Sequence, residues 1–156
     1  MKLAEALAER KTLQDKLAWL RARLVANARV QEGDQPAERP EALLGEANDT
    51  AAALEILIVR INRTNIAAQL PGEPRLTIME AVARRDTLRV RFTALSELVA
   101  AAQPGPQRFA LTRSEIRSRP TVGVAGLQQQ VDTQAREIRE LDTRLQAANW
   151  TIDLVE

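Results

Sequence analysis

Aliphatic side chains recur at intervals of three and four residues along four long stretches of this 156-residue chain. That spacing gathers them on one face of an α-helix, because a helix turns once every 3.6 residues. Proline and glycine interrupt the pattern after each of the first three stretches. The sequence therefore predicts an all-α protein with four long amphipathic helices, which cover residues 3–28, 40 to the break at Pro71, 78–102 and 124–149.

The four predicted helices have similar lengths of about 25 residues, or roughly 38 Å each. Short linkers favour antiparallel neighbours, so we expect one domain of residues 1–156. Its helices form either an antiparallel bundle or paired helical hairpins. The last stretch has close to heptad spacing, which is typical of coiled-coil packing: Val124, Leu127, Val131, Ala135, Ile138, Leu141 and Leu145.

Local signals support two of the helix starts. Pro40 suits the first turn of the second helix, where a backbone N–H has no intrahelical acceptor. Thr77 and Glu80 have the spacing of a capping box, which predicts the start of the third helix. Residues 104–123 differ from the rest, because apolar and polar residues partly alternate there. We expect a short extended arm or β-hairpin in that segment.

The composition excludes several kinds of chemistry. The chain contains no cysteine, histidine or tyrosine, so thiolate nucleophiles, zinc sites with nitrogen or sulfur ligands and histidine bases are ruled out. Its formal net charge is only +1, from 22 basic and 21 acidic residues, which argues against a dedicated nucleic-acid binder. We expect a protein that is not an enzyme and needs no cofactor.

Hydropathy predicts a cytoplasmic protein that does not cross a membrane. The first residues carry charges every few positions and have no apolar core of the kind found in signal peptides. The longest apolar run, Leu54 to Val59, contains Glu55 and is far shorter than a membrane span.

One end of the predicted bundle collects polar residues from the ends of the second and fourth helices. Two interpretations remain open for this polar pole. Asparagine amides near an apolar stripe can form a buried polar layer that sets helix register. The same groups could bind a small ligand or a partner. The residues of the polar pole are Arg60, Asn62, Arg63, Asn65, Asn149 and Trp150.

The predicted arm is basic and contains Arg108, Arg113, Arg117 and Arg119. The formal charges of residues 103–126 sum to +3, and those of residues 127–156 sum to −3. This difference favours an arm that packs across a neighbouring subunit and pairs with acids of the fourth helix. Those acids are Asp132, Glu137, Glu140 and Asp142. Contact with nucleic-acid phosphates is the alternative.

Several large apolar residues fall outside the predicted internal stripes. Ile56 and Val59 make the second helix apolar all round near its middle, so it is either central in the bundle or in contact with a second subunit. Trp19 lies away from the stripe of the first helix, at the bundle edge or in an interface. We expect a homo-oligomer whose candidate interface contains Trp19, Ile56, Val59 and Phe109.

Several strings along the chain resemble a family of small bacterial proteins called septicolysin or septicolysin-like. They include Ile61-Asn62-Arg63-Thr64-Asn65 and Leu141 to Thr151. The name implies a pore-forming toxin, whereas the residues contain neither a membrane-length helix nor a long alternating strand. No catalytic or binding residue carries over from the family. The sequence thus predicts a non-enzymatic homo-oligomer with a binding or scaffolding role, with a nucleic-acid-associated protein and a small-ligand binder as alternatives.

Overall fold

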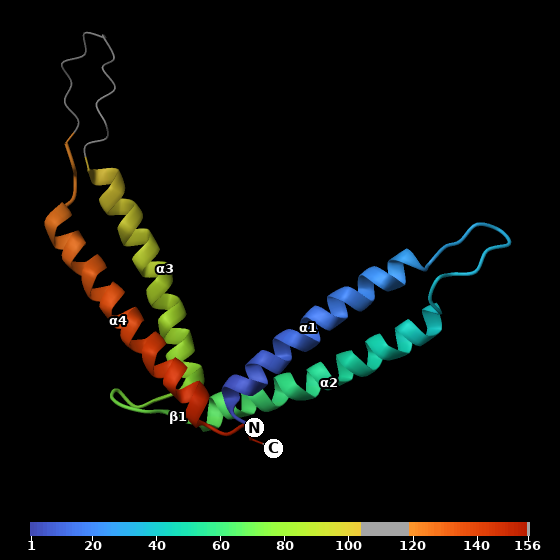
Figure 1. Cartoon of the computed structure of the whole chain (residues 1–156). Coiled ribbons are helices and arrows are strands. Elements are labelled where there is room, and N and C mark those ends of the chain that lie inside the picture. Colours follow the sequence, from blue (N-terminus) through green and yellow to red (C-terminus); the bar gives the residue numbers. More distant parts are fainter. Residues whose placement is uncertain (104–118, 156) are drawn as a thin grey trace, which may run out of the picture. The chain divides into compact units, whose positions relative to one another are not determined.

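The computed structural model describes residues 1–103 and 119–155 (Figure 1). The described residues form four α-helices and one small antiparallel sheet, which confirms the predicted all-α fold class. The helices are α1 (Leu3–Ala26), α2 (Pro40–Ala67), α3 (Ile78–Ala102) and α4 (Val124–Thr151). The sheet pairs β1 (Gln69–Leu70) with β2 (Leu76–Thr77).

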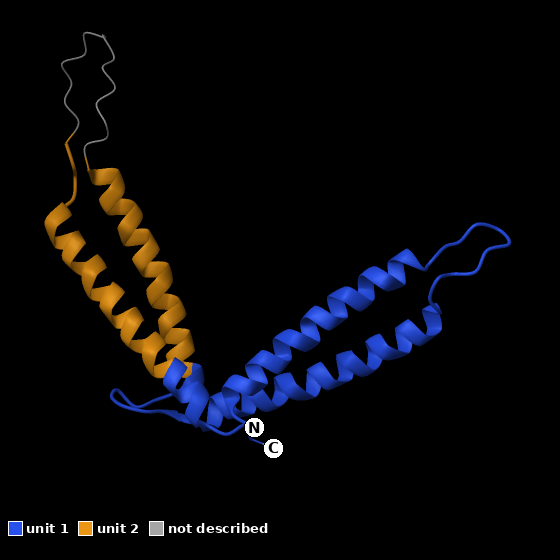
Figure 2. Ribbon diagram, viewed as in Figure 1, with its two compact units in different colours: residues 1–79, 146–156 blue, residues 80–145 orange. Residues whose placement is uncertain are grey.

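The chain forms two compact units (Figure 2). Unit 1 comprises residues 1–79 and 146–156, and unit 2 comprises residues 80–145. In unit 1, α1 and α2 lie side by side as an antiparallel hairpin, with ion pairs between Lys16 and Glu46 near the middle and between Arg23 and Glu38 near the tip. In unit 2, α3 and most of α4 lie side by side (Figure 1). Each unit is therefore built on one helical hairpin.

The helix ends follow local chemistry. The α1 helix ends two residues before its predicted end, because both the backbone N–H and the side-chain amide of Asn27 donate to the Arg23 carbonyl, at 3.0 and 2.9 Å. The α2 helix has Pro40 in its first turn, as the sequence predicts. The α3 helix begins at Ile78, directly after Thr77.

The β1–β2 hairpin was not predicted. It pairs Gln69 with Thr77 and Leu70 with Leu76 around a turn that contains Gly72, whose φ of 91° suits glycine because it has no Cβ. The Ile78 N–H then donates to the Ala68 carbonyl at 3.0 Å, which holds the first residue of α3 next to the end of α2. Strands of two residues are too short to leave an alternating pattern in a sequence.

Each unit buries its own aliphatic residues. The buried residues of unit 1 include Leu3, Leu20, Leu43, Leu57, Ile61 and Leu154, and those of unit 2 include Ala81, Leu88, Val99, Val131, Leu141 and Leu145. The middle of α2 is covered on one side only: Leu57 is 6% exposed, whereas Ile56 is 63% and Val59 41% exposed. The Ile56–Val59 segment is therefore buried on one side within unit 1, and both predicted alternatives for it stay predictions.

Candidate functional site

The polar pole of the sequence lies in unit 1, where the residues that follow α4 contact the end of α2. The Arg60 side chain donates from Nε to the Val155 carbonyl at 3.1 Å. The Val155 N–H donates to the Thr64 hydroxyl at 2.9 Å, and that hydroxyl donates to the Arg60 carbonyl at 2.9 Å. Thr64 is fully buried. The expected meeting of these two chain segments therefore takes place through Thr64 and Arg60.

The asparagines of the polar pole lie closer to the surface than expected. Asn62, Arg63 and Trp150 are exposed, and Asn65 and Asn149 are half-buried. Thr64 follows the buried Ile61 by three residues and continues the internal stripe of α2, so it takes the interior position. The buried polar residue is thus a threonine whose hydroxyl is fully hydrogen-bonded. Continuing the Leu57–Ile61 spacing by three residues would have found it.

Lys2 joins the two chain ends within unit 1. Its Nζ donates to the Asp153 carboxylate at 2.9 Å and to the Thr151 carbonyl at 3.0 Å. Backbone bonds from Leu3 N to Ile152 O and from Leu154 N to Met1 O, at 3.0 and 2.9 Å, flank this pair. The hydrogen bond from Lys2 lowers the pKa of Asp153 below its ordinary value. The polar groups here hold the fold together.

Trp19 and the Ile56–Val59 segment lie on different helices. The Arg23 guanidinium stacks over the Trp19 ring at 3.9 Å from its centroid, and the indole remains 57% exposed. Lys16 of α1 pairs with Glu46 of α2. Trp19 follows Lys16 by three residues, so it lies beside the first turns of the antiparallel α2. Ile56 lies ten residues after Glu46, at least about 15 Å further along the helix. Trp19 and Ile56 therefore do not form one continuous patch.

The side of α2 that points away from α1 carries exposed aliphatic residues. Leu44 is 53% exposed and Ile66 57% exposed, in addition to Ile56 and Val59. Five residues define what we call the outer face of α2: Leu44, Ala52, Ile56, Val59 and Ile66. The opposite side of the helix is the one buried in unit 1, and it carries Leu43, Thr50, Leu57, Ile61 and Thr64. Exposed polar residues lie among these side chains on the same side of the helix, namely Asn48, Glu55 and Arg63.

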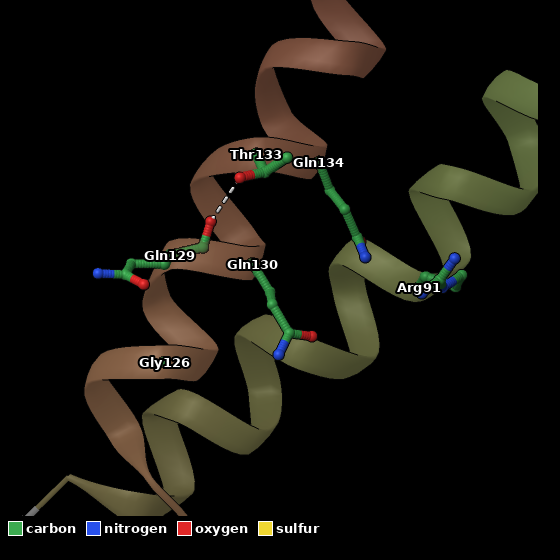
Figure 3. A pocket seen from close by; sticks show the side chains of 6 residues that line it. All are labelled: Arg91, Gly126, Gln129, Gln130, Thr133 and Gln134. Atoms are coloured by element: carbon green, nitrogen blue, oxygen red, sulfur yellow. Dashed lines mark hydrogen bonds between the residues drawn. The ribbon is translucent and has the colours of Figure 1, made fainter.

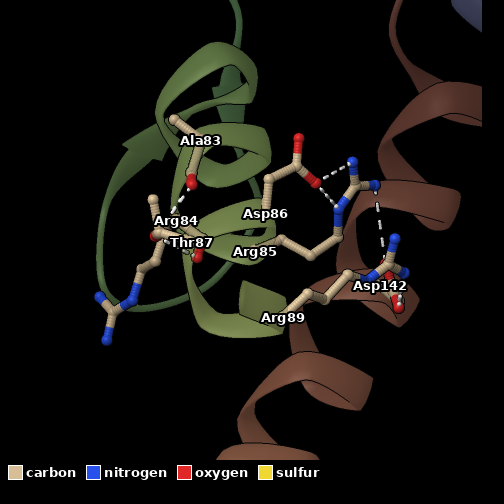
Figure 4. Close-up of polar contacts among 7 residues, drawn as sticks. All are labelled: Ala83, Arg84, Arg85, Asp86, Thr87, Arg89 and Asp142. Carbon is tan, nitrogen blue, oxygen red and sulfur yellow. Dashed lines mark hydrogen bonds and ion pairs between the residues drawn. The ribbon is translucent and has the colours of Figure 1, made fainter. Parts of the chain in front are cut away.

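Most of the predicted basic arm lies outside the described residues. That holds for Arg108, Phe109, Arg113 and Arg117, whereas Arg119 is described and exposed. Two of the acids proposed as partners of the arm form ion pairs with arginines of α3. Arg84 Nε donates to Glu137 at 2.9 Å. Arg89 donates to Asp142 at 2.8 Å, and Figure 4 shows these two residues.

Arg85 completes this set of ion pairs in unit 2, because it contacts Asp86 at 2.7 Å and Asp142 at 3.7 Å (Figure 4). Glu137 and Asp142 are therefore paired within the α3–α4 hairpin. The charge of a segment does not show which arginine lies opposite which acid, because that depends on how α3 aligns with α4.

An open groove of about 540 Å³ lies on unit 2. Figure 3 shows Gln134 reaching from α4 toward α3, whereas Gln129 points away from α3. Gln134 is only 8% exposed, and no described residue donates to its buried Oε1. The groove is lined by Arg91, Gly126, Gln129, Gln130, Thr133 and Gln134. Gln134 rather than the predicted Ala135 occupies the heptad position between Val131 and Ile138, since Gln134 is buried and Ala135 only half-buried. It therefore interrupts an otherwise apolar seam.

Neither a metal site nor a membrane helix is found in the described part of the chain. No group of three or more acidic side chains is placed to hold a metal ion there. No helix in residues 1–103 and 119–155 is long and apolar enough to cross a bilayer.

Fold and surface together define an all-α protein built from two helical hairpins. The model of a family of unknown function, DUF6847, matches residues 10–154, and the chain belongs to this family. None of the curated proteins matches the chain. A crystal structure of a functionally unknown conserved protein from Corynebacterium diphtheriae is similar to it, with 35% sequence identity, a TM-score of 0.86 and 99% of each chain covered. These comparisons do not support the septicolysin-like name.

Proposed function

We propose that this protein is a non-enzymatic homo-oligomer with a binding or scaffolding role in the cytoplasm. One observation carries the proposal: the outer face of α2 presents Ile56, Val59 and Ile66 to solvent, at 63, 41 and 57% exposure. Covering such a surface with another chain removes apolar area from water, which is favourable by about 25 cal/mol per Å². Extended apolar patches on proteins commonly mark interaction sites.

The hydrogen bonds and ion pairs of the polar groups support a role without catalysis. Arg60 and Thr64 at the polar pole, and Arg84, Arg85 and Arg89 of unit 2, are all engaged in hydrogen bonds or ion pairs that hold the fold. A chain without histidine and cysteine also lacks the commonest general bases and nucleophiles. Nucleic-acid binding by the arm and lysis are not part of the proposal, because no described contact favours either.

The mass of the native protein tests this proposal. Light scattering over a wide range of protein concentrations should give a mass above the 17.3 kDa of one chain. Ile56→Lys should shift the protein toward the monomer, because it places a charge on the outer face of α2. Val90→Lys is the matched control, since Val90 is 72% exposed on α3. A wild-type mass of one chain at every concentration contradicts the proposal.

A further inference from the structure

We infer that the outer face of α2 binds the same face of a second copy, in antiparallel orientation, about a two-fold axis through Val59. The inference rests on the proposed homo-oligomer and adds the surface, the orientation and the axis. It follows from how charge and side-chain size are distributed along α2 on either side of Val59.

Charges lie symmetrically about Val59. Glu55 precedes it by four residues and Arg63 follows it by four, so they lie about 40° to either side of Val59 around the helix. Both side chains are exposed. Eight residues, or about 12 Å, separate them along α2, too far for them to pair with each other. Neither forms an ion pair with any residue of the described ranges 1–103 and 119–155.

Antiparallel pairing brings these opposite charges to the same level. A two-fold axis through Val59 sets Glu55 of each copy beside Arg63 of the other, which forms two equivalent pairs. Parallel pairing in register would set Glu55 against Glu55 and Arg63 against Arg63, and like charges repel. The charges therefore select the antiparallel arrangement.

Side-chain size is complementary about the same axis. Ala52 and Ile66 each lie seven residues from Val59, about 20° from its direction, and both are exposed. The two-fold axis sets the methyl group of Ala52 against the larger Ile66 side chain of the other copy. Large-to-small contacts allow close approach of two helices, while Val59 meets its own counterpart on the axis. Size and charge thus point to the same residue as the centre.

The test is a charge-reversal cycle on the full chain, measured by sedimentation across the dissociation range. A single helix-to-helix seam is a small interface, so the dimer should dissociate at about micromolar concentration. Glu55→Arg and Arg63→Glu should each weaken association about tenfold or more, because each converts two opposite-charge contacts into like-charge contacts. The double variant should regain most of the wild-type affinity, since it re-forms both pairs with reversed polarity.

Matched controls are Glu140→Arg and Arg139→Glu on α4, where both residues are exposed. They should leave association within about twofold of the wild type. Helical circular dichroism of each variant verifies that the reversed charges leave the chain folded. Two outcomes would contradict the pairing about Val59 but not the homo-oligomer. In the first, the chain assembles and all four single variants change its affinity equally. In the second, the double variant does not regain the wild-type affinity. A wild-type protein that stays monomeric at all concentrations would contradict both the pairing about Val59 and the homo-oligomer.

Discussion

Arg23 connects three parts of unit 1 through a single side chain. Its guanidinium stacks on Trp19, and its Nε donates to the Glu38 carboxylate at 2.8 Å. Glu38 in turn is held by its backbone N–H, which donates to Asn27 at 3.0 Å. These contacts fix the loop between α1 and α2.

The Arg23–Glu38 pair predicts a pH dependence of stability. The hydrogen bond from Arg23 lowers the folded-state pKa of Glu38 below its ordinary value of 4.5. The carboxylate therefore stabilises the fold fully above about pH 4.5, and this contribution is lost as the pH falls through the lowered pKa. Glu38→Gln should lower the free energy of unfolding slightly at pH 7, because solvent screens the pair.

Urea unfolding between pH 3 and 7 measures this effect. The difference between the wild type and Glu38→Gln should shrink toward pH 3. Glu32→Gln, an exposed position in the same loop, is the control and should change stability little at pH 7. A difference that stays constant down to pH 3 would contradict an ionised Glu38 as its source.

At the scale of elements, the α3–α4 hairpin contains one polar residue within its heptad seam. Gln134 is buried, yet its Oε1 accepts no hydrogen bond from the described residues. A buried, unsatisfied carbonyl oxygen costs about 1–3 kcal/mol relative to one in water.

Gln134→Leu should stabilise the protein by about 1 kcal/mol, because it replaces an amide whose buried Oε1 has no partner among the described residues with an apolar side chain. The expected rise in Tm is about 2–4 °C, measured by calorimetry. Gln130→Leu, at an exposed position on the same helix, should change Tm by much less. A lower Tm for Gln134→Leu would show that the amide has a stabilising partner.

The elements differ in how far the sequence predicts them. Apolar spacing located all four helices, and Pro40 marked the start of α2 within a residue. The sequence does not predict the β1–β2 hairpin, because two residues per strand are too few to form an alternating pattern. The arm predicted at 104–123 falls mostly outside the described residues and stays a prediction.

At the scale of the whole molecule, self-association should appear in the thermal stability. Partners that bind only the folded state stabilise it by mass action, so the Tm of a homo-oligomer rises with protein concentration. We expect an increase of about 2 °C per tenfold concentration for the wild type, and less for Arg63→Glu. Scanning calorimetry at several concentrations measures this dependence, and a constant wild-type Tm would speak against association in the folded state.

The candidate site shows where sequence reasoning stops. Exposed Ile56 and Val59 were expected in an interface because they lie off the internal stripe of α2, and their exposure follows from the same geometry. Thr64 was overlooked because threonine is neither charged nor strongly apolar, and only its partner Val155, 91 residues away, makes it a buried polar contact.

The sequence by itself determined the four helices and their internal faces, because the period of aliphatic residues reports local backbone geometry. It also excluded histidine and cysteine chemistry. Only the tertiary structure decided which acids pair with which arginines, that Thr64 receives the Val155 N–H, and that Gln134 lies in the seam of unit 2. Such contacts join residues far apart in the chain, and their alignment depends on packing between elements, which no local pattern encodes.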